Sequence, residues 1–64
     1  MARNAVKDFY GKILGYIDEE PNGDRIARGF TFEILGKYDR ANNVTRDFYG
    51  KILYQGDHVE ALIK

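Results

Sequence analysis

Aspartates are the first candidates for chemistry, because five of them recur at the ends of a repeated segment. Asp8 and Asp47 open two copies of this segment, while Asp18, Asp39 and Asp57 close its three copies. Paired carboxylates act as general acid and base when their environments push their pKa values apart. Repeated strand ends also need such residues for turn capping and edge protection, and 64 residues leave little length for a pocket. We therefore predict structural aspartates and no enzyme activity.

The acidic segment 18–24 is similar in composition to the start of a calcium-binding loop. A complete loop needs a bidentate acidic ligand at its twelfth residue, which here is Gly29. The single histidine, His58, has no partners at a recognisable ligand spacing. Cysteine and serine are absent from the sequence, which excludes thiolate sites and serine nucleophiles. We expect no metal, no cofactor and no catalytic residue.

The composition indicates one small domain, residues 1–64, without cysteines that could form a stabilising disulfide. A chain of this size buries only about 60% of its unfolded surface, so pairing with a second copy is the remaining source of stability. Ten basic and ten acidic side chains cancel, which argues against a dedicated nucleic-acid or membrane-surface binder. No apolar run is long enough to span a bilayer, and the first residues do not resemble a signal peptide. We expect a cytoplasmic protein.

An internal repeat dominates the sequence. Residues 8–14 recur letter for letter as residues 47–53, and a degraded copy lies between them, which indicates internal duplication. The three motif copies are residues 7–18, 28–39 and 46–57. The unequal spacing of these copies favours a meander over a strict solenoid, whose stacked coils need a constant period.

Alternating residue types predict that each copy forms one strand. One face is expected to form the core, with Phe30 and Phe48 as counterparts of Phe9; in the first copy this face comprises Phe9, Gly11, Ile13, Gly15 and Ile17. Phe32 is expected to fill the space that Gly11 and Gly50 leave open. Residues 58–64 form a further strand or a short helix capped by Asp57. We predict an all-β fold, an antiparallel meander of three to four long, bent strands, completed as a small barrel or sandwich by a homodimer.

The opposite face combines tyrosines with a row of leucines. Interfaces concentrate tyrosine around a buried apolar centre. The predicted interface therefore comprises Tyr10, Leu14, Tyr16, Leu35, Tyr49 and Leu53. This face fits either the chain's own dimer contact or a heterologous protein partner, and the sequence leaves both open. We predict a homodimeric, non-catalytic module that acts by stoichiometric protein binding.

A second class of function is a small β-barrel that binds nucleic acid. Residues 28–32, Arg-Gly-Phe-Thr-Phe, are similar to aromatic strand motifs that stack single-stranded bases. The neutral net charge and the many acidic residues weigh against this reading, so it stays the alternative.

The motif Asp-Phe-Tyr-Gly-Lys-Ile-Leu-Gly resembles that of very small bacterial and phage-associated proteins with repeated Asp-Phe-Tyr-Gly-(Lys/Arg)-Ile-Leu-Gly segments. The likeness runs from Val6 to Ile63, and the middle copy departs from it at four residues, Gly29, Thr31, Phe32 and Glu33. The resemblance implies no catalytic residue. It implies a mobile-element setting, in which a short phage protein inhibits a bacterial anti-phage defence enzyme in the host cytoplasm.

Overall fold

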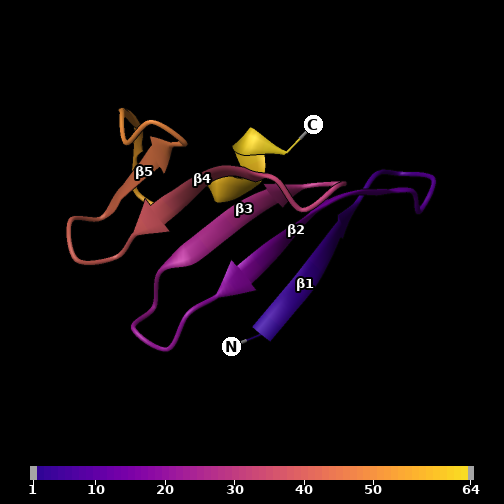
Figure 1. The fold of residues 1–64 in the computed structure, drawn as a ribbon, viewed down its shortest axis with the longest axis horizontal. Helices are drawn as coiled ribbons and strands as arrows, with labels where there is room; N and C mark the ends of the chain where they lie inside the picture. Colours follow the sequence, from indigo (N-terminus) through magenta and orange to yellow (C-terminus); the bar gives the residue numbers. More distant parts are fainter. Residues whose placement is uncertain (1, 64) are drawn as a thin grey trace.

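The chain forms a meander in which each strand pairs with its neighbours in the sequence. The computed structural model describes residues 2–63 as one antiparallel sheet of six strands in the order β1-β2-β3-β4-β5-β6, followed by a single 3-10 turn, η1 (Figure 1). The all-β antiparallel prediction is confirmed. The elements are β1 (Ala2–Lys7), β2 (Ile13–Glu19), β3 (Arg25–Gly29), β4 (Ile34–Asp39), β5 (Val44–Asp47), β6 (Ile52–Gln55) and η1 (Val59–Leu62).

The repeated motif forms hairpin turns, so the predicted three to four long strands are wrong. In the first copy the backbone N–H of Asp8 donates to the carbonyl of Lys12 at 2.9 Å, and Gly11 donates to Asp8 at 3.1 Å. The last copy closes in the same way between Asp47 and Lys51. Each copy therefore reverses the chain near its start. The three motif turns join six strands in pairs, and two further turns connect these pairs into a sheet with five hairpins.

Positive φ angles make these reversals. Within residues 2–63, each of the five hairpins carries one such residue in its turn: Gly11, Gly23, Phe32, Asn43 and Gly50. A type I turn followed by a left-handed residue is a common way to close a three-residue hairpin loop. Glycine and asparagine adopt that conformation readily, whereas a phenylalanine with φ of 68° is an outlier that its neighbours must hold in place.

A bulge follows each motif turn, and its extra residue is the leucine. In the first hairpin Lys7 lies opposite Ile13 and Val6 lies opposite Gly15, so Leu14 has no partner in the register. The register skips Leu35 and Leu53 in the other two hairpins. A bulge changes which face the following residues occupy. The strict alternation predicted for each copy therefore does not hold.

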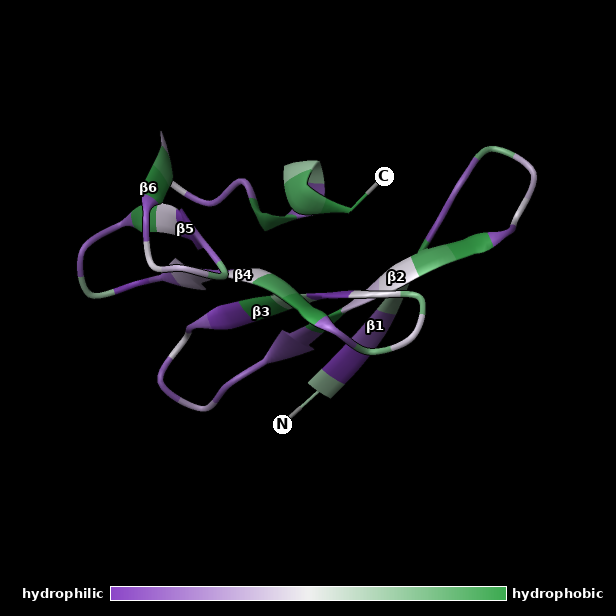
Figure 2. Ribbon diagram, turned by 45° about the horizontal axis from the view of Figure 1, so that its top comes forward, coloured by the Kyte–Doolittle hydropathy of each residue, from purple (hydrophilic) through white to green (hydrophobic). Residues whose placement is uncertain are grey.

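The core lies between one face of the sheet and η1, which Figure 2 shows as an apolar turn beside the strands. Its buried members are Ile17, Ala27, Val59 and Ile63. Leu14 and Leu35 pack against this cluster from the sheet. The predicted core phenylalanines, Phe9, Phe30 and Phe48, are instead exposed, because they lie in the turns and not in the strands.

Glycines let η1 approach the sheet. A Cβ at Gly36 would lie 2.6 Å from Leu62 Cδ1, and one at Gly15 would lie 2.9 Å from Ile63 Cγ2. These glycines are therefore sites of close approach. Gly11 and Gly50 face open space, so the expectation that Phe32 covers them is wrong.

The sheet is open, with β1 and β6 at its two edges, and the expectation of a closed small barrel is wrong for this chain. The predicted short C-terminal helix is present as η1, but Asp57 does not cap it: His58 is the N-cap and makes no side-chain cap bond. Asp57 instead accepts a hydrogen bond from Arg25 at 2.6 Å, which ties the chain leaving the sheet to β3. Among residues 2–63, no helix has the length and apolar character to cross a membrane.

Candidate protein-binding site

Two hairpin tips present the same pair of aromatic side chains to solvent. We call residues 8–12 the first tip and residues 47–51 the third tip. Phe9 and Tyr10 are 95% and 90% exposed, and Phe48 and Tyr49 are 63% and 89% exposed. The rings meet edge to face in both tips, with centroids 5.6 Å and 5.4 Å apart. Figure 1 places the two tips at opposite ends of the molecule.

An aspartate carboxylate fixes the backbone of each tip. Asp8 Oδ1 accepts hydrogen bonds from the backbone N–H groups of Tyr10 at 2.8 Å and Lys12 at 2.9 Å. Asp47 Oδ1 accepts the same two bonds from Tyr49 and Lys51. The carboxylates are thus used as local acceptors, and the tips are held rigid.

The turn itself explains Asp and Gly but not Phe and Tyr. Aspartate at the first position and glycine at the fourth are typical of type I turns, whose two central positions accept most residues. The side chains of the two central residues are mostly exposed in both tips, so they contribute little buried surface to this chain. The exposed Phe-Tyr pair of each tip is therefore explained neither by the turn nor by packing within this chain.

The middle tip, residues 29–33, differs because the ring of Phe32 folds back onto the sheet. Phe32 stacks on Tyr16 with centroids 4.6 Å apart and an interplanar angle of 16°. The Arg3 guanidinium lies 5.0 Å from the same ring, and Arg28 Nη1 donates to the Phe32 carbonyl at 2.9 Å. These contacts hold Phe32 in its left-handed conformation. In the middle tip Phe32 therefore packs within the chain while Phe30 is 62% exposed, whereas both aromatic side chains of the first and third tips are exposed.

Asp18 organises the charges beside this stack. It is buried, and its two carboxylate oxygens accept hydrogen bonds from Arg3 Nε at 2.6 Å, Arg3 Nη2 at 2.9 Å and Arg28 Nε at 2.8 Å. The bonds from Arg3 and then Arg28 outweigh desolvation and lower the pKa of Asp18 to about 2. This carboxylate is a structural counter-ion for two arginines.

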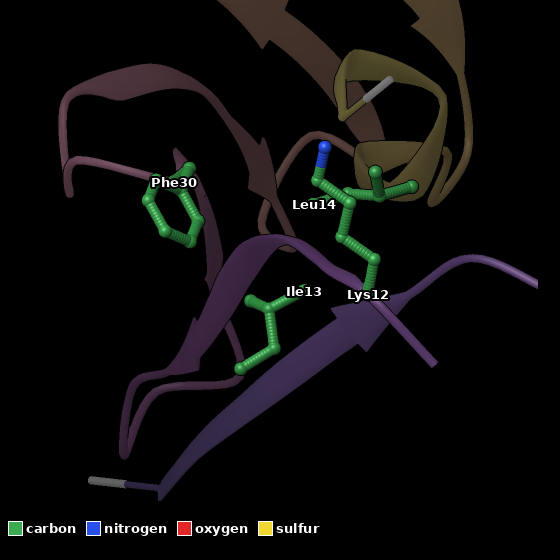
Figure 3. A pocket seen from close by; sticks show the side chains of 4 residues that line it. All are labelled: Lys12, Ile13, Leu14 and Phe30. Atoms are coloured by element: carbon green, nitrogen blue, oxygen red, sulfur yellow. The ribbon is translucent and has the colours of Figure 1, made fainter. Parts of the chain in front are cut away.

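A groove lies next to the first tip. It has a volume of about 340 Å³ and is lined by Lys12, Ile13, Leu14 and Phe30. Figure 3 shows Phe30 on one side of the groove and Leu14 on the other. Phe30 lies in the turn between β3 and β4, so the groove forms where the first and middle motif copies meet.

The structure separates the six residues predicted to form one interface. Tyr10 and Tyr49 are at the two free tips, while Tyr16 is stacked under Phe32. Leu14 and Leu35 pack against the core, and Leu53 lies on the edge strand β6. The exposed phenylalanines of the tips, Phe9 and Phe48, were expected in the core. The spacing of Asp8 and Gly11, and of Asp47 and Gly50, is the signal that places them in turns.

The other candidates for chemistry are dispersed. Within the part of the chain that the structure describes, no group of three or more His, Cys, Asp or Glu side chains has metal-site geometry. The ring of His58 lies beside Tyr54, with centroids 5.4 Å apart.

No protein-family model, curated protein or solved structure matches the chain. The resemblance to small phage-associated proteins therefore stays a prediction.

Replacing Asp47 by alanine is expected to lower the free energy of unfolding by about 1–2 kcal/mol, because two backbone N–H groups lose a charged acceptor. The Asp47→Asn variant keeps an acceptor oxygen and is expected to lose less than half as much. Urea denaturation followed by circular dichroism measures both. Equal losses in the two variants would contradict the assigned role of the side-chain hydrogen bonds.

Proposed function

We propose that the chain is a non-catalytic protein-binding module whose contact elements are the first and third tips. The observation that carries the proposal is the exposed Phe-Tyr pair, present twice on a turn that does not require it. Aromatic side chains are enriched at the centres of protein interfaces, where they fill pockets on the partner. Burial of each such side chain contributes roughly 150–250 Å² of contact area.

The rigidity of the tips supports binding. Ordering a flexible loop at an interface costs free energy, and a preformed loop avoids that cost. The aspartate bonds and the glycine turn hold each tip in one backbone conformation before any partner arrives. The net charge of zero provides no long-range attraction to a charged partner. Shape and apolar contact at the tips would therefore determine specificity.

The proposal includes self-association and a stoichiometric mode of action. A chain with so little buried apolar surface, no disulfide and, among residues 2–63, ten exposed large hydrophobic residues gains stability by pairing. The most concrete version is an inhibitor of a bacterial anti-phage defence enzyme, acting in the host cytoplasm. That version rests on the motif resemblance alone.

Capture from a lysate of the encoding organism tests the proposal. The natural chain is compared with a variant in which Phe9, Tyr10, Phe48 and Tyr49 are all serine. A protein retained in stoichiometric amount by the natural chain should fall about tenfold, since each tenfold in affinity corresponds to only 1.4 kcal/mol. A control variant changes Ala41→Ser and Gln55→Ala, two exposed residues outside the tips, and should retain the same protein.

Circular dichroism checks that both variants are folded. The proposal is wrong if the folded serine variant retains every protein that the natural chain retains, in the same amounts.

A further inference from the structure

The first and third tips have the same sequence but different surroundings. Beside the first tip, β2 is followed by β3 and β4, and Phe30 from their turn borders the groove. Beside the third tip, β6 is the edge strand of the sheet formed by residues 2–63, and η1 follows it in the described chain. Ile52 and Leu53 are accordingly 52% and 40% exposed, whereas their counterparts Ile13 and Leu14 are half-buried. The identical tips are therefore not equivalent binding elements.

We infer that the first tip docks into the groove of a second copy of the chain, and that the third tip is left for a different protein. This inference rests on the proposed function, because it assigns different partners to the two proposed contact elements. A dimer built on the first tip would then present two third tips.

The groove suits an aromatic side chain with a polar end. Its volume of about 340 Å³ is at the small end of the range for ligand pockets, roughly 300–1,000 Å³, and its walls are mainly apolar. Ile13, Leu14 and Phe30 offer contact to a ring. The Lys12 ammonium supplies a cation for the face of a tyrosine. Tyr10 of a second copy, which is 90% exposed, matches these features.

The position of the groove favours a second copy over another protein. A two-fold dimer needs a self-complementary patch, in which the donor and acceptor surfaces lie close together. Tip and groove share one hairpin here, since Phe9 and Tyr10 directly precede Lys12, Ile13 and Leu14. Asp8 and Lys12 of the same tip carry unlike charges, so two copies can face each other there without like-charge repulsion.

The area fits a weak dimer. Two tips contribute four aromatic side chains of roughly 150–250 Å² each, or roughly 600–1,000 Å² together, and the groove walls add little to this area. Such an area is typical of weak, transient pairs, whose specific interfaces bury less than roughly 1,200 Å². The net charge of zero adds no repulsion between the copies.

Sedimentation equilibrium across the micromolar range tests the assignment with a matched pair of variants. Tyr10→Ser should weaken self-association by about tenfold or more, as expected for loss of an aromatic interface anchor. Tyr49→Ser makes the same change in the same turn and should leave the dimer constant unchanged. A monomeric natural chain, or equal effects of the two substitutions, would overturn the inference.

Cysteine trapping gives an independent measurement, because the chain has no cysteine of its own. At protein concentrations well above the weakened dimer constant, the double variant Tyr10→Cys with Phe30→Cys should oxidise to a covalent dimer. The matched variant Tyr49→Cys with Phe30→Cys should remain monomeric on a non-reducing gel. A covalent dimer in the second variant alone would assign the groove to the third tip and contradict the inference.

The two proposals fail separately. If the dimer tests fail while the serine variant still loses a captured protein, the tips bind other proteins and the groove is not a self-docking site. If Tyr10→Ser dissolves a dimer but capture is unchanged by the tip substitutions, self-association stands and the heterologous function does not.

Discussion

Replacing Gly36 by alanine is expected to destabilise the protein by about 2 kcal/mol, because the added methyl group overpacks the contact between the sheet and η1. The new Cβ would lie against the Arg46 carbonyl, 2.6 Å from Leu62 Cδ1 and 3.2 Å from Asp47 Cα. Leu62 belongs to the single-turn cover of the core, and β5 cannot shift without disturbing its pairing with β4. The small gain in unfolded-state entropy from alanine, about 0.4–1 kcal/mol, does not offset these clashes.

Thermal unfolding measures the effect, and about 2 kcal/mol corresponds to a Tm lower by about 8–16 °C in a domain of this size. Gly11→Ala serves as the control. Its Cβ meets nothing within 4 Å, so it reports only the cost of a positive φ. The interpretation of Gly36 as a close-approach site fails if Gly36→Ala is no more destabilising than Gly11→Ala.

Asp18→Asn is expected to cost about 2–3 kcal/mol in the free energy of unfolding. The carboxylate is buried between Arg3 and Arg28, and the amide leaves two guanidinium groups together with one acceptor oxygen. The loss is below that of a fully buried ion pair because both arginines are partly exposed to water, which screens their charges. The adjacent Glu19→Gln, an exposed charge change in the same strand, should cost little and serves as the control.

The pH dependence of the Asp18 variant has a definite sign. The folded pKa of Asp18 is about 2, below its ordinary value of 3.8, so folding favours the ionised form. The stability that this group contributes is therefore complete above the ordinary value and is lost as the pH falls from 3.8 towards 2. The difference in unfolding free energy between the natural chain and Asp18→Asn should shrink over that interval. A constant difference would show that the charge of Asp18 does not stabilise the fold.

The class of the fold follows from the sequence, but the reversal points were misplaced. Alternating β-branched and aromatic residues indicate strands, and that indication is correct for the second half of each copy. The first half contains Phe9 and Tyr10, which favour strands by residue type but lie in a turn. Asp8 and Gly11 decide the conformation, because the carboxylate accepts two turn N–H bonds and glycine takes the positive φ. Turn chemistry outweighs side-chain preference at these positions.

The sequence predicts which tyrosines are available for contact, but it does not predict where they lie relative to the leucines. Tyr10 and Tyr49 were singled out by composition and are exposed at the tips. Their separation from Leu14 and Leu35 follows from the bulges, because one extra residue per hairpin shifts the leucines toward the core. No local pattern in a single sequence marks such a bulge. The groove could not be predicted from the sequence either, since it forms only when Phe30, from the turn between β3 and β4, lies beside β2.

The meander also determines the order in which the chain gains its structure. Every strand pairs with a sequence neighbour across a short turn, so the entropy cost of closing each hairpin is small. The contacts that cover the core span the chain, as in the bond between Arg25 and Asp57, 32 residues apart. Residues 59–63 follow all six strands in the chain, so the sheet can pair before the turn that covers its apolar face has docked. Until η1 docks, that apolar face is open to contact with other chains.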